Sequence, residues 1–506
     1  LFNKPSEVIW LINMLLKNDN RPTLRYNQLF DENQNITEEG KSRLIQKTRG
    51  YISYLRGENP ITFPIRLYPD SNKDKHCLET YPLLDIWNNK IPKENAYKFM
   101  NLYASSFTGI QKKAYNSFIK SIQENKNLQI TESKRGSQIS NIVYPTISYL
   151  SKKTTTIDLK TCSGSAGLHN IMNRSIKNNL SSYSYKQEYL DLVENSPMFE
   201  KSNIKQYSSK INTVLEKVSS SEGIVFIYSQ YLSAGLIPMA LALEHMGFTK
   251  YGSENLLSYK HKGKQSGSYI LLSGDITISP NNQQSIQEIT SPQNKDGSKI
   301  KVVLGSVVAS EGLDLKNIRE IHIIDPWFHL FRVEQIIGRG IRFCSHMGLE
   351  KKKRNVTIYQ HVGISSKSEN ESVDIFIYRQ AEQKARKIGN IEHILKQNSI
   401  DCLLNKGLNV ITKDNVKPIT LQTSQGNVLT NFNIHDKPYS KMCSFQETCD
   451  FPCSTSKNFD EITNDTVNFD TFNPSDSKFL IQSVKHKICK MYELFSFYSL
   501  QEIEKE

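Results

Sequence analysis

Two arginines stand three residues apart in the stretch 335–342, which reads Q-I-I-G-R-G-I-R. Residues three apart on a helix share a face, so the spacing predicts that Arg339 and Arg342 project together. A guanidinium is planar, always charged and donates in a fixed fork, which suits a phosphate whose charge grows during transfer. The pattern therefore favours a clamp for phosphoryl transfer. The alternative is an amphipathic surface helix with two solvated arginines.

Four short apolar runs upstream predict the elements that must position these arginines. They are Ile224–Ser229, Tyr269–Asp275, Val302–Gly305 and Ile321–Asp325, and a turn at Pro326–Phe328 leads into the arginine stretch. Continuous apolar runs of this length are typical of strands buried in a parallel sheet. The carboxyl ends of such strands form the catalytic edge of an α/β sheet. The sequence thus predicts an α/β fold with the arginines beside that edge.

In this order the runs resemble motifs of superfamily-2 helicases and remodeller-type ATPases. The stretch 335–342 is similar to motif VI, the stretch 306–314 (S-V-V-A-S-E-G-L-D) to motif V, and the strand ending at Ser229 to motif IV. The strand that ends in Gly274-Asp275 is similar to the motif between IV and V. The resemblance implies a RecA-like C-terminal helicase lobe, a parallel sheet with helices on both faces, carrying helical and loop-rich extensions.

The resemblance also assigns roles to positions of this chain. In the family the two arginines of motif VI stabilise the γ-phosphoryl charge, and the preceding glutamine positions them. The positions that carry nucleotide chemistry are then Arg339, Arg342, Gln335, Gly312, Asp314 and Gly338. The positions that hold nucleic-acid phosphates are Ser229, Gly274 and Ser306.

Two longer strings, 47–60 and 378–405, are similar to helicases of nucleocytoplasmic large DNA viruses. That group includes the poxvirus nucleoside triphosphatase I and the small subunit of the poxvirus early transcription factor. This similarity implies a viral NTPase linked to transcription, with a DNA or RNA backbone and the viral RNA polymerase as partners. The implied location is the virion or the viral factory in the host cytoplasm. The alternative for both strings is plain helix and strand.

The sequence contains no G-x-x-x-x-G-K-[ST] loop and no Asp-Glu pair after an apolar strand. Without them a chain cannot cradle NTP phosphates and Mg²⁺ by itself. We therefore expect ATP and Mg²⁺ to bind through a first helicase lobe, in cis or as a separate chain. On this interpretation residue 1 follows the point where a first lobe would finish. The rival is a non-enzymatic nucleic-acid-binding or scaffold subunit, and the intact arginine pair argues against it.

The chain has 506 residues and a net charge of +13, from 64 Lys+Arg and 51 Asp+Glu. A basic excess of this size favours a polyanionic partner. The alternative is that lysine and asparagine usage reflects an A/T-rich genome. The apolar run Val8–Leu16 is too short to span a bilayer, so no membrane partner is expected.

Three of the eight cysteines cluster in C-S-F-Q-E-T-C-D-F-P-C, at Cys443, Cys449 and Cys453. Three thiolates with a fourth ligand, Cys402 or His435, could complete a tetrahedral zinc site. The alternative is free reduced thiols, because the sequence has no export signal and a reducing compartment disfavours disulfides.

Composition and periodicity predict five regions. Residues 1–120 follow the first lobe, 121–205 form a polar insertion with loops, and 206–400 form the second RecA-like lobe with its C-terminal helix. Residues 401–470 are loop-rich and contain the cysteines, and 471–506 are helical and could open a winged helix. Within them, apolar residues at spacings of three and four predict a helix from Val373 to about Gln397, and Ser499 is expected to cap a final helix.

Overall fold

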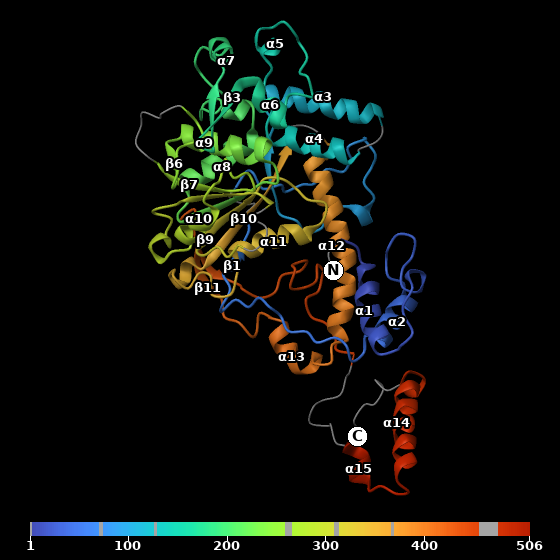
Figure 1. The fold of residues 1–506 in the computed structure, drawn as a ribbon. Helices are drawn as coiled ribbons and strands as arrows, with labels where there is room; N and C mark the ends of the chain where they lie inside the picture. The colour runs from blue at the N-terminus through green and yellow to red at the C-terminus, as the bar shows by residue number, and fades with distance from the viewer. Residues whose placement is uncertain are drawn as a thin grey trace. The chain divides into compact units, whose positions relative to one another are not determined.

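The computed structural model describes residues 3–69, 74–125, 129–258, 266–307, 313–365, 369–454 and 474–505 (Figure 1). They divide into two compact units. The larger unit comprises Gly57–Ala385 and Thr412–His435, and the smaller comprises Leu1–Arg56, Arg386–Ile411 and Asp436–Glu506.

A parallel sheet forms the centre of the larger unit. Its strands run in the order β1-β10-β9-β5-β8-β7-β6, and β2 also pairs with β10. Every pairing in this sheet is parallel. The bounds are β1 Ile65–Leu67, β2 Leu102–Ser106, β5 Ile224–Tyr228, β6 Phe248–Lys250, β7 Gly267–Leu272, β8 Val302–Gly305, β9 Ile318–Ile323 and β10 Asn355–Ile364.

Helices pack on both faces of this sheet. Successive side chains of a strand point to opposite faces, so each strand contributes residues to both helical layers. On one face His322 of β9 stacks on Tyr359 of β10, and Lys217 of α8 (Ser209–Ser220) lies over the Tyr359 ring. On the other face α11 (Leu330–Gly340) rests on Ile321 of β9 through Gly340. The predicted architecture, a parallel sheet between two helical layers, is confirmed.

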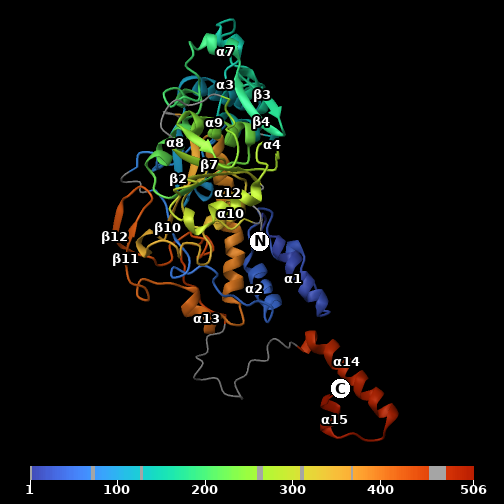
Figure 2. The same cartoon turned by 60° about the vertical axis from the view of Figure 1, so that its left-hand side comes forward.

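Residues 121–205 were predicted to be a polar insertion with loops, and the structure places helices and a β-hairpin between those loops. The segment contains α4 (Ile130–Asn141), α5 (Ile147–Leu150), α6 (Gly164–Ile171) and α7 (Gln187–Leu192). It also contains an antiparallel hairpin, β3 (Met172–Lys177) with β4 (Leu180–Tyr185), seen at the edge of the larger unit in Figure 2. Single apolar residues scattered among the serines and asparagines, such as Tyr144, Leu168 and Phe199, enter the same core as β5 and α9 (Ile237–His245).

The long helix predicted from 373 to about 397 is α12, Val373–Gln397. In the smaller unit its apolar residues Ile391 and Ile394 share a core with α1 (Glu7–Asn18) and α2 (Glu38–Thr48). Other elements are α3 Gly109–Asn125, α10 Asn282–Ile289, α13 Cys402–Asn409, β11 Ile419–Gln422, β12 Val428–Phe432, α14 Pro474–Leu494 and α15 Leu500–Lys505.

Ser499 caps α15 as predicted, because its side chain and amide bond to the Glu502 carboxylate and its hydroxyl accepts from the Glu502 amide. Across the part of the chain that the structure describes, no helix is long and apolar enough to cross a membrane.

The predicted zinc site is not supported. The structure pairs Cys402 with Cys453 and Cys443 with Cys449 as disulfides, so their sulfurs are not thiolate ligands. Among the described residues no group of His, Cys, Asp and Glu is arranged to hold a metal ion. The expectation of free thiols also fails for these four, because the fold brings together positions 51 and 6 residues apart that spacing alone did not pair.

Glu244 of α9 predicts a pH-dependent stability. It is buried, and its carboxylate accepts from the Tyr269 hydroxyl and from the amides of Leu256 and Leu257. Burial raises its pKa to about 7, against the lowering effect of these bonds. A raised folded-state pKa gives stability that is full below the ordinary pKa of 4.5 and is lost as pH rises through 7.

Between pH 5 and 8 this loss amounts to about 2–3 kcal/mol at 1.36 kcal/mol per pKa unit. Urea unfolding at both pH values is expected to show Glu244→Gln gaining about that much relative to the wild type on going to pH 8. A difference between the two proteins that stays constant with pH would contradict the assignment.

Candidate functional site

Three central strands end together at one edge of the sheet. Tyr228 of β5 and Leu272 of β7 are both register partners of Gly305 of β8. The loops that begin with Ser229, Ser273 and Ser306 therefore leave the sheet side by side. This edge collects the positions that the sequence singled out on three separate strands, as expected for the carboxyl ends of parallel strands.

Ser229, however, does not face solvent. It is fully buried, and its hydroxyl donates to both carboxylate oxygens of Asp325 at 3.0 Å. Asp325 also accepts from the Gln230 amide at 2.6 Å and from the Asn141 side chain. In this structure the Ser229 side chain is therefore buried against the Asp325 carboxylate.

Behind this pair lies a buried ion pair that sequence reasoning did not find. Lys210 of α8 and Asp374 of α12 have side chains with no exposed surface, and their charged atoms are 2.7 Å apart. Lys210 also donates to Asn141 Oδ1 at 3.0 Å and to the Ile324 carbonyl at 2.9 Å. Burial raises the pKa of Asp325 to about 6, and Lys210 opposes this rise. The network ties two helices to the end of β9.

The other two edge positions differ in exposure. Gly274 is exposed, immediately beyond β7. Ser306 is 6% exposed, and its amide donates to the Leu272 carbonyl at 3.0 Å. Gly274 and Ser306 therefore stand on adjacent loops at the same edge of the sheet.

The two arginines lie at the carboxyl end of α11. Ile341 has extended backbone, so the helix ends at Gly340 and Arg342 stands outside it. Arg342 nevertheless folds back, and its Nε donates to the Gly338 carbonyl at 3.1 Å. Arg339 in the last turn also complements the negative end of the helix dipole.

Both arginines lie beside the end of the predicted motif V. Arg339 Nη1 donates to the Leu313 carbonyl at 3.4 Å, and the Leu315 amide donates to the Arg339 carbonyl at 3.1 Å. Arg342 Nε is 3.8 Å from Asp314 Oδ1, and the Asp314 side chain is 56% exposed. Gly312 lies outside the described residues. The structure thus brings Asp314, Arg339 and Arg342 together, although they are up to 28 positions apart.

Gln335 and Gly338 occupy the same helix. Gln335 is half-buried and lies one turn before Arg339, which places both on one face. A Cβ built on Gly338 would meet no atom within 4 Å, so packing does not require glycine there and space lies beside it. Arg332 continues this face at i, i+3 and i+7 with Gln335 and Arg339. The Arg332 guanidinium stacks on the Trp327 ring at 4.1 Å from its centroid. The i, i+3, i+7 spacing in the sequence is the signal from which Arg332 could have been predicted.

An ion-pair network fixes α11 against the edge of the sheet. Arg66 of β1 bonds to Glu334 at 2.8 Å and to Glu58 at 2.7 Å. Its side chain is 19% exposed, so the pairs are largely shielded from solvent. Because Glu334 precedes Gln335, this network sets the rotation of the helix and therefore the direction of its polar face.

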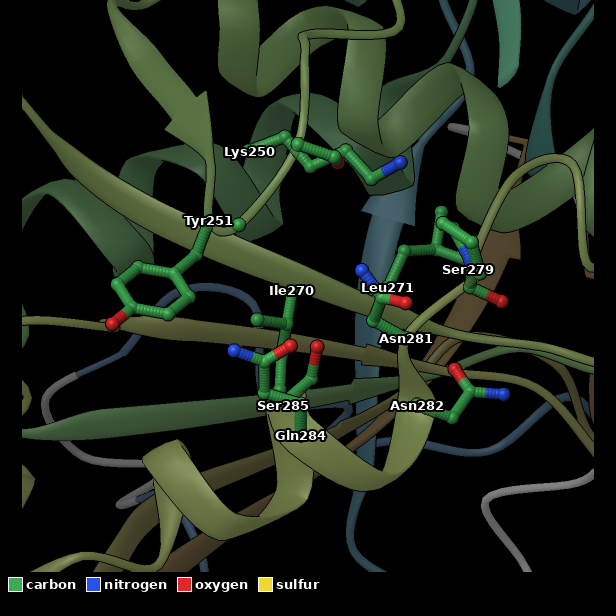
Figure 3. A pocket seen from close by; sticks show the side chains of 12 residues that line it. Lys250, Tyr251, Ile270, Leu271, Ser279, Asn281, Asn282, Gln284 and Ser285 are labelled. Carbon is green, nitrogen blue, oxygen red and sulfur yellow. The ribbon is translucent and has the colours of Figure 1, made fainter. Parts of the chain in front are cut away.

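A small hollow lies at the β6 side of the sheet, beside β6, β7 and α10 (Figure 3). Its lining includes Lys250, Tyr251 and Asn282. Lys250 is not free there, because Nζ donates to the Ile278 carbonyl at 2.6 Å and burial lowers its pKa. The hollow does not contain the arginines and is separate from the arginine site.

The sequence is similar to known proteins over the region that contains these residues. Residues 210–344 match the family described as helicase conserved C-terminal domain. A protein of Acanthamoeba polyphaga mimivirus named as an ATP-dependent RNA helicase is 26% identical over 92% of this chain and 42% of its own length. A protein of Invertebrate iridescent virus 3 named as a helicase is 32% identical over 42% of this chain and 22% of its own.

The termination factor NPH-I homolog of African swine fever virus is 27% identical over 39% of this chain and 33% of its own length. The chain therefore spans less than half the length of each of these three relatives. The central sheet, with helices on both faces, is that of a RecA-like helicase lobe. The chain is thus similar to the helicase conserved C-terminal domain over residues 210–344, and two of these three viral relatives are named as helicases.

Proposed function

We propose that this chain supplies the second lobe of a viral, nucleic-acid-dependent NTPase of the helicase type. The observation that carries the proposal is the meeting of Arg339, Arg342 and Asp314 at the end of α11. Two guanidiniums beside an exposed carboxylate form a polar cluster that fits the phosphate and sugar of a nucleotide. The chain has no phosphate-binding loop, so ATP and Mg²⁺ bind through a first lobe, in the same polypeptide or in a partner.

In this assembly Arg339 and Arg342 stabilise the charge that develops on the transferred phosphoryl group. Gln335, one turn before Arg339, orients it and senses closure of the two lobes. Asp314, with Gly312 before it, faces the nucleotide sugar. Gly338, where a Cβ would meet no atom within 4 Å, lets the nucleotide approach this helix. Mg²⁺ on the first lobe would neutralise phosphate charge, and no residue of this chain is assigned to it.

The nucleic acid lies along the carboxyl edge, where the exposed Gly274 and the loop at Ser306 contact backbone phosphates. Such contacts grip the backbone without reading bases. Ser229 has a different role, because it holds Asp325 at the root of this edge.

The setting that fits best is transcription in a virus with cytoplasmic replication, with the viral RNA polymerase as a partner and the virion or viral factory as the location. The African swine fever virus relative, named as a termination factor homolog, supports this setting.

Binding to nucleic acid is expected to be weak, insensitive to sequence and dependent on salt. If the edge loops and nearby lysines neutralise about three to five phosphates, log K falls with log salt at a slope of roughly −3 to −4. Fluorescence anisotropy of labelled oligonucleotides of different sequence, titrated at several salt concentrations, measures this slope. Binding that ignores salt or that strongly prefers one sequence would contradict a backbone grip.

A further inference from the structure

Hairpin β3–β4 is fixed against the loop that follows β7. The Ser181 amide donates to the Thr277 carbonyl at 2.8 Å. Arg174 Nη2 donates to Asp275 Oδ2 at 2.9 Å and to Thr277 Oγ1 at 2.8 Å. The same loop carries the exposed Gly274. The hairpin and this loop, residues 172–185 and 273–279, therefore form one continuous surface, called here the hairpin–loop surface.

The base of the hairpin is anchored in the core. Met172 and Tyr183 are 1% and 3% exposed. The Tyr183 amide donates to the Leu256 carbonyl at 2.6 Å, and the Ser258 amide donates to the Tyr183 carbonyl at 2.9 Å. The Tyr185 hydroxyl is 2.8 Å from His245 Nε2 of α9. A hairpin held at its base in this way presents its tip in a defined direction.

That tip carries apolar and basic side chains into solvent. Ile176 is 55% exposed, and its cross-strand partner is Ser181, the residue bonded to the loop. Ile276, on the loop itself, is 73% exposed. Lys177 follows Ile176 and is also exposed. Two exposed isoleucines therefore flank the Ser181–Thr277 junction, with a lysine next to one of them.

The charge of this region is one-sided. The hairpin–loop surface contains two cations, Arg174 and Lys177, and one carboxylate, Asp275. The nearest carboxylate on the loop, Asp275, is already paired with Arg174. Because Arg174 neutralises Asp275, Lys177 leaves this surface with a net positive charge, which complements a polyanion.

We propose that the hairpin–loop surface binds a single-stranded segment of nucleic acid. Lys177 contacts a backbone phosphate, and Ile176 and Ile276 pack against sugars and unstacked bases of the same strand. Aliphatic side chains reach base faces only where stacking is interrupted, which favours a single strand over an intact duplex. The inference rests on the proposed function, because it extends the backbone contact at Gly274 to a second element.

The experiment measures binding of the full chain to a fluorescein-labelled oligothymidylate of about 20 nucleotides, and to a duplex of equal length, across a salt series. Lys177→Gln is expected to weaken single-strand binding about 3- to 10-fold and to make the salt slope shallower by about 0.7, the value of one phosphate contact. Ile176→Ser combined with Ile276→Ser is expected to weaken single-strand binding with an unchanged slope. The matched control is Lys295→Gln, another exposed lysine, which stands before β8 at the amino end of the sheet.

The outcomes separate this inference from the proposed function. If the wild type binds the single strand and Lys177→Gln binds it with the same affinity as Lys295→Gln, the hairpin–loop surface is overturned as a binding site. The proposed contact at Gly274 is not affected by that result. Equal losses on duplex and single strand in the isoleucine variant overturn the single-strand assignment. A wild-type chain that binds neither probe overturns both proposals. Thermal melting of each variant checks that the exposed substitutions leave the fold intact.

Discussion

Replacing Lys210 by methionine is expected to destabilise the larger unit by about 3–5 kcal/mol, the cost typical of leaving a buried charge without its partner. Lys210 and Asp374 are both fully buried, and Asp374 also accepts from the Gly363 amide at 2.8 Å and from the Ser140 hydroxyl. Without the ammonium group the Asp374 carboxylate stays buried beside Ser140 with no compensating cation. Urea unfolding at neutral pH measures the loss.

The matched control is the double variant Lys210→Met with Asp374→Asn. Its amide oxygen can still accept from the Gly363 amide, and no net charge remains in the pair. Replacing both members of a buried pair is often close to neutral, so most of the lost stability should return. The account is contradicted if the single variant loses less than about 1 kcal/mol of unfolding free energy. It is also contradicted if the double variant is no more stable than the single one, because the pair would then not stabilise the larger unit.

The parts of the fold with strong local signals were predicted correctly from the sequence. Apolar runs placed β5, β7, β8 and β9 to within a few residues, since a strand buried on both faces is apolar along its length. Spacings of three and four placed α12 at its observed bounds. The helix with Gln335 and Arg339 was also found, but its end was not, because glycine at 340 and extended backbone at Ile341 depend on packing against β9.

The parts that depend on distant partners were not predictable. In the sequence Ser229 follows an apolar strand, whether its hydroxyl binds a phosphate or a partner inside the protein. The structure shows that it is buried because it bonds to Asp325, 96 positions away. β9 was predicted as a plain apolar strand, yet Glu320 and His322 are fully buried in it. The hydroxyl of Ser424, in a hairpin loop 104 positions from Glu320, donates to the Glu320 carboxylate. The same carboxylate also pairs with His322. Polar residues buried by such partners are indistinguishable in sequence from exposed ones.

The largest effects are expected at the two arginines once this chain is joined to a first lobe with a phosphate-binding loop. Arg339→Ala removes a guanidinium that lies beside Leu313 and Asp314, at the predicted interlobe face. Losing an arginine that acts on the transferred phosphoryl group costs about 10³-fold or more in turnover in comparable sites. Nucleotide affinity should change far less, because the contact strengthens where charge develops.

Arg342→Lys is the sharper variant. It keeps the positive charge near Asp314 and loses only the planar fork. If Arg342 only caps the end of α11 and does not act on the nucleotide, Arg342→Lys changes the free energy of unfolding by no more than about 0.5 kcal/mol. Turnover is then unaffected. The control is Arg43→Ala, an exposed arginine of α2 paired with Glu39 in the smaller unit.

The central claim is tested most directly by steady-state NTP turnover of the joined assembly, measured with nucleotide affinity for the wild type, Arg339→Ala, Arg342→Lys and Arg43→Ala. This chain without a first lobe gives the baseline, which is expected to show no turnover. The account predicts losses of about 10³-fold in both site variants, near-normal nucleotide affinity and full activity in the control. Near-normal turnover in both Arg339→Ala and Arg342→Lys would contradict it.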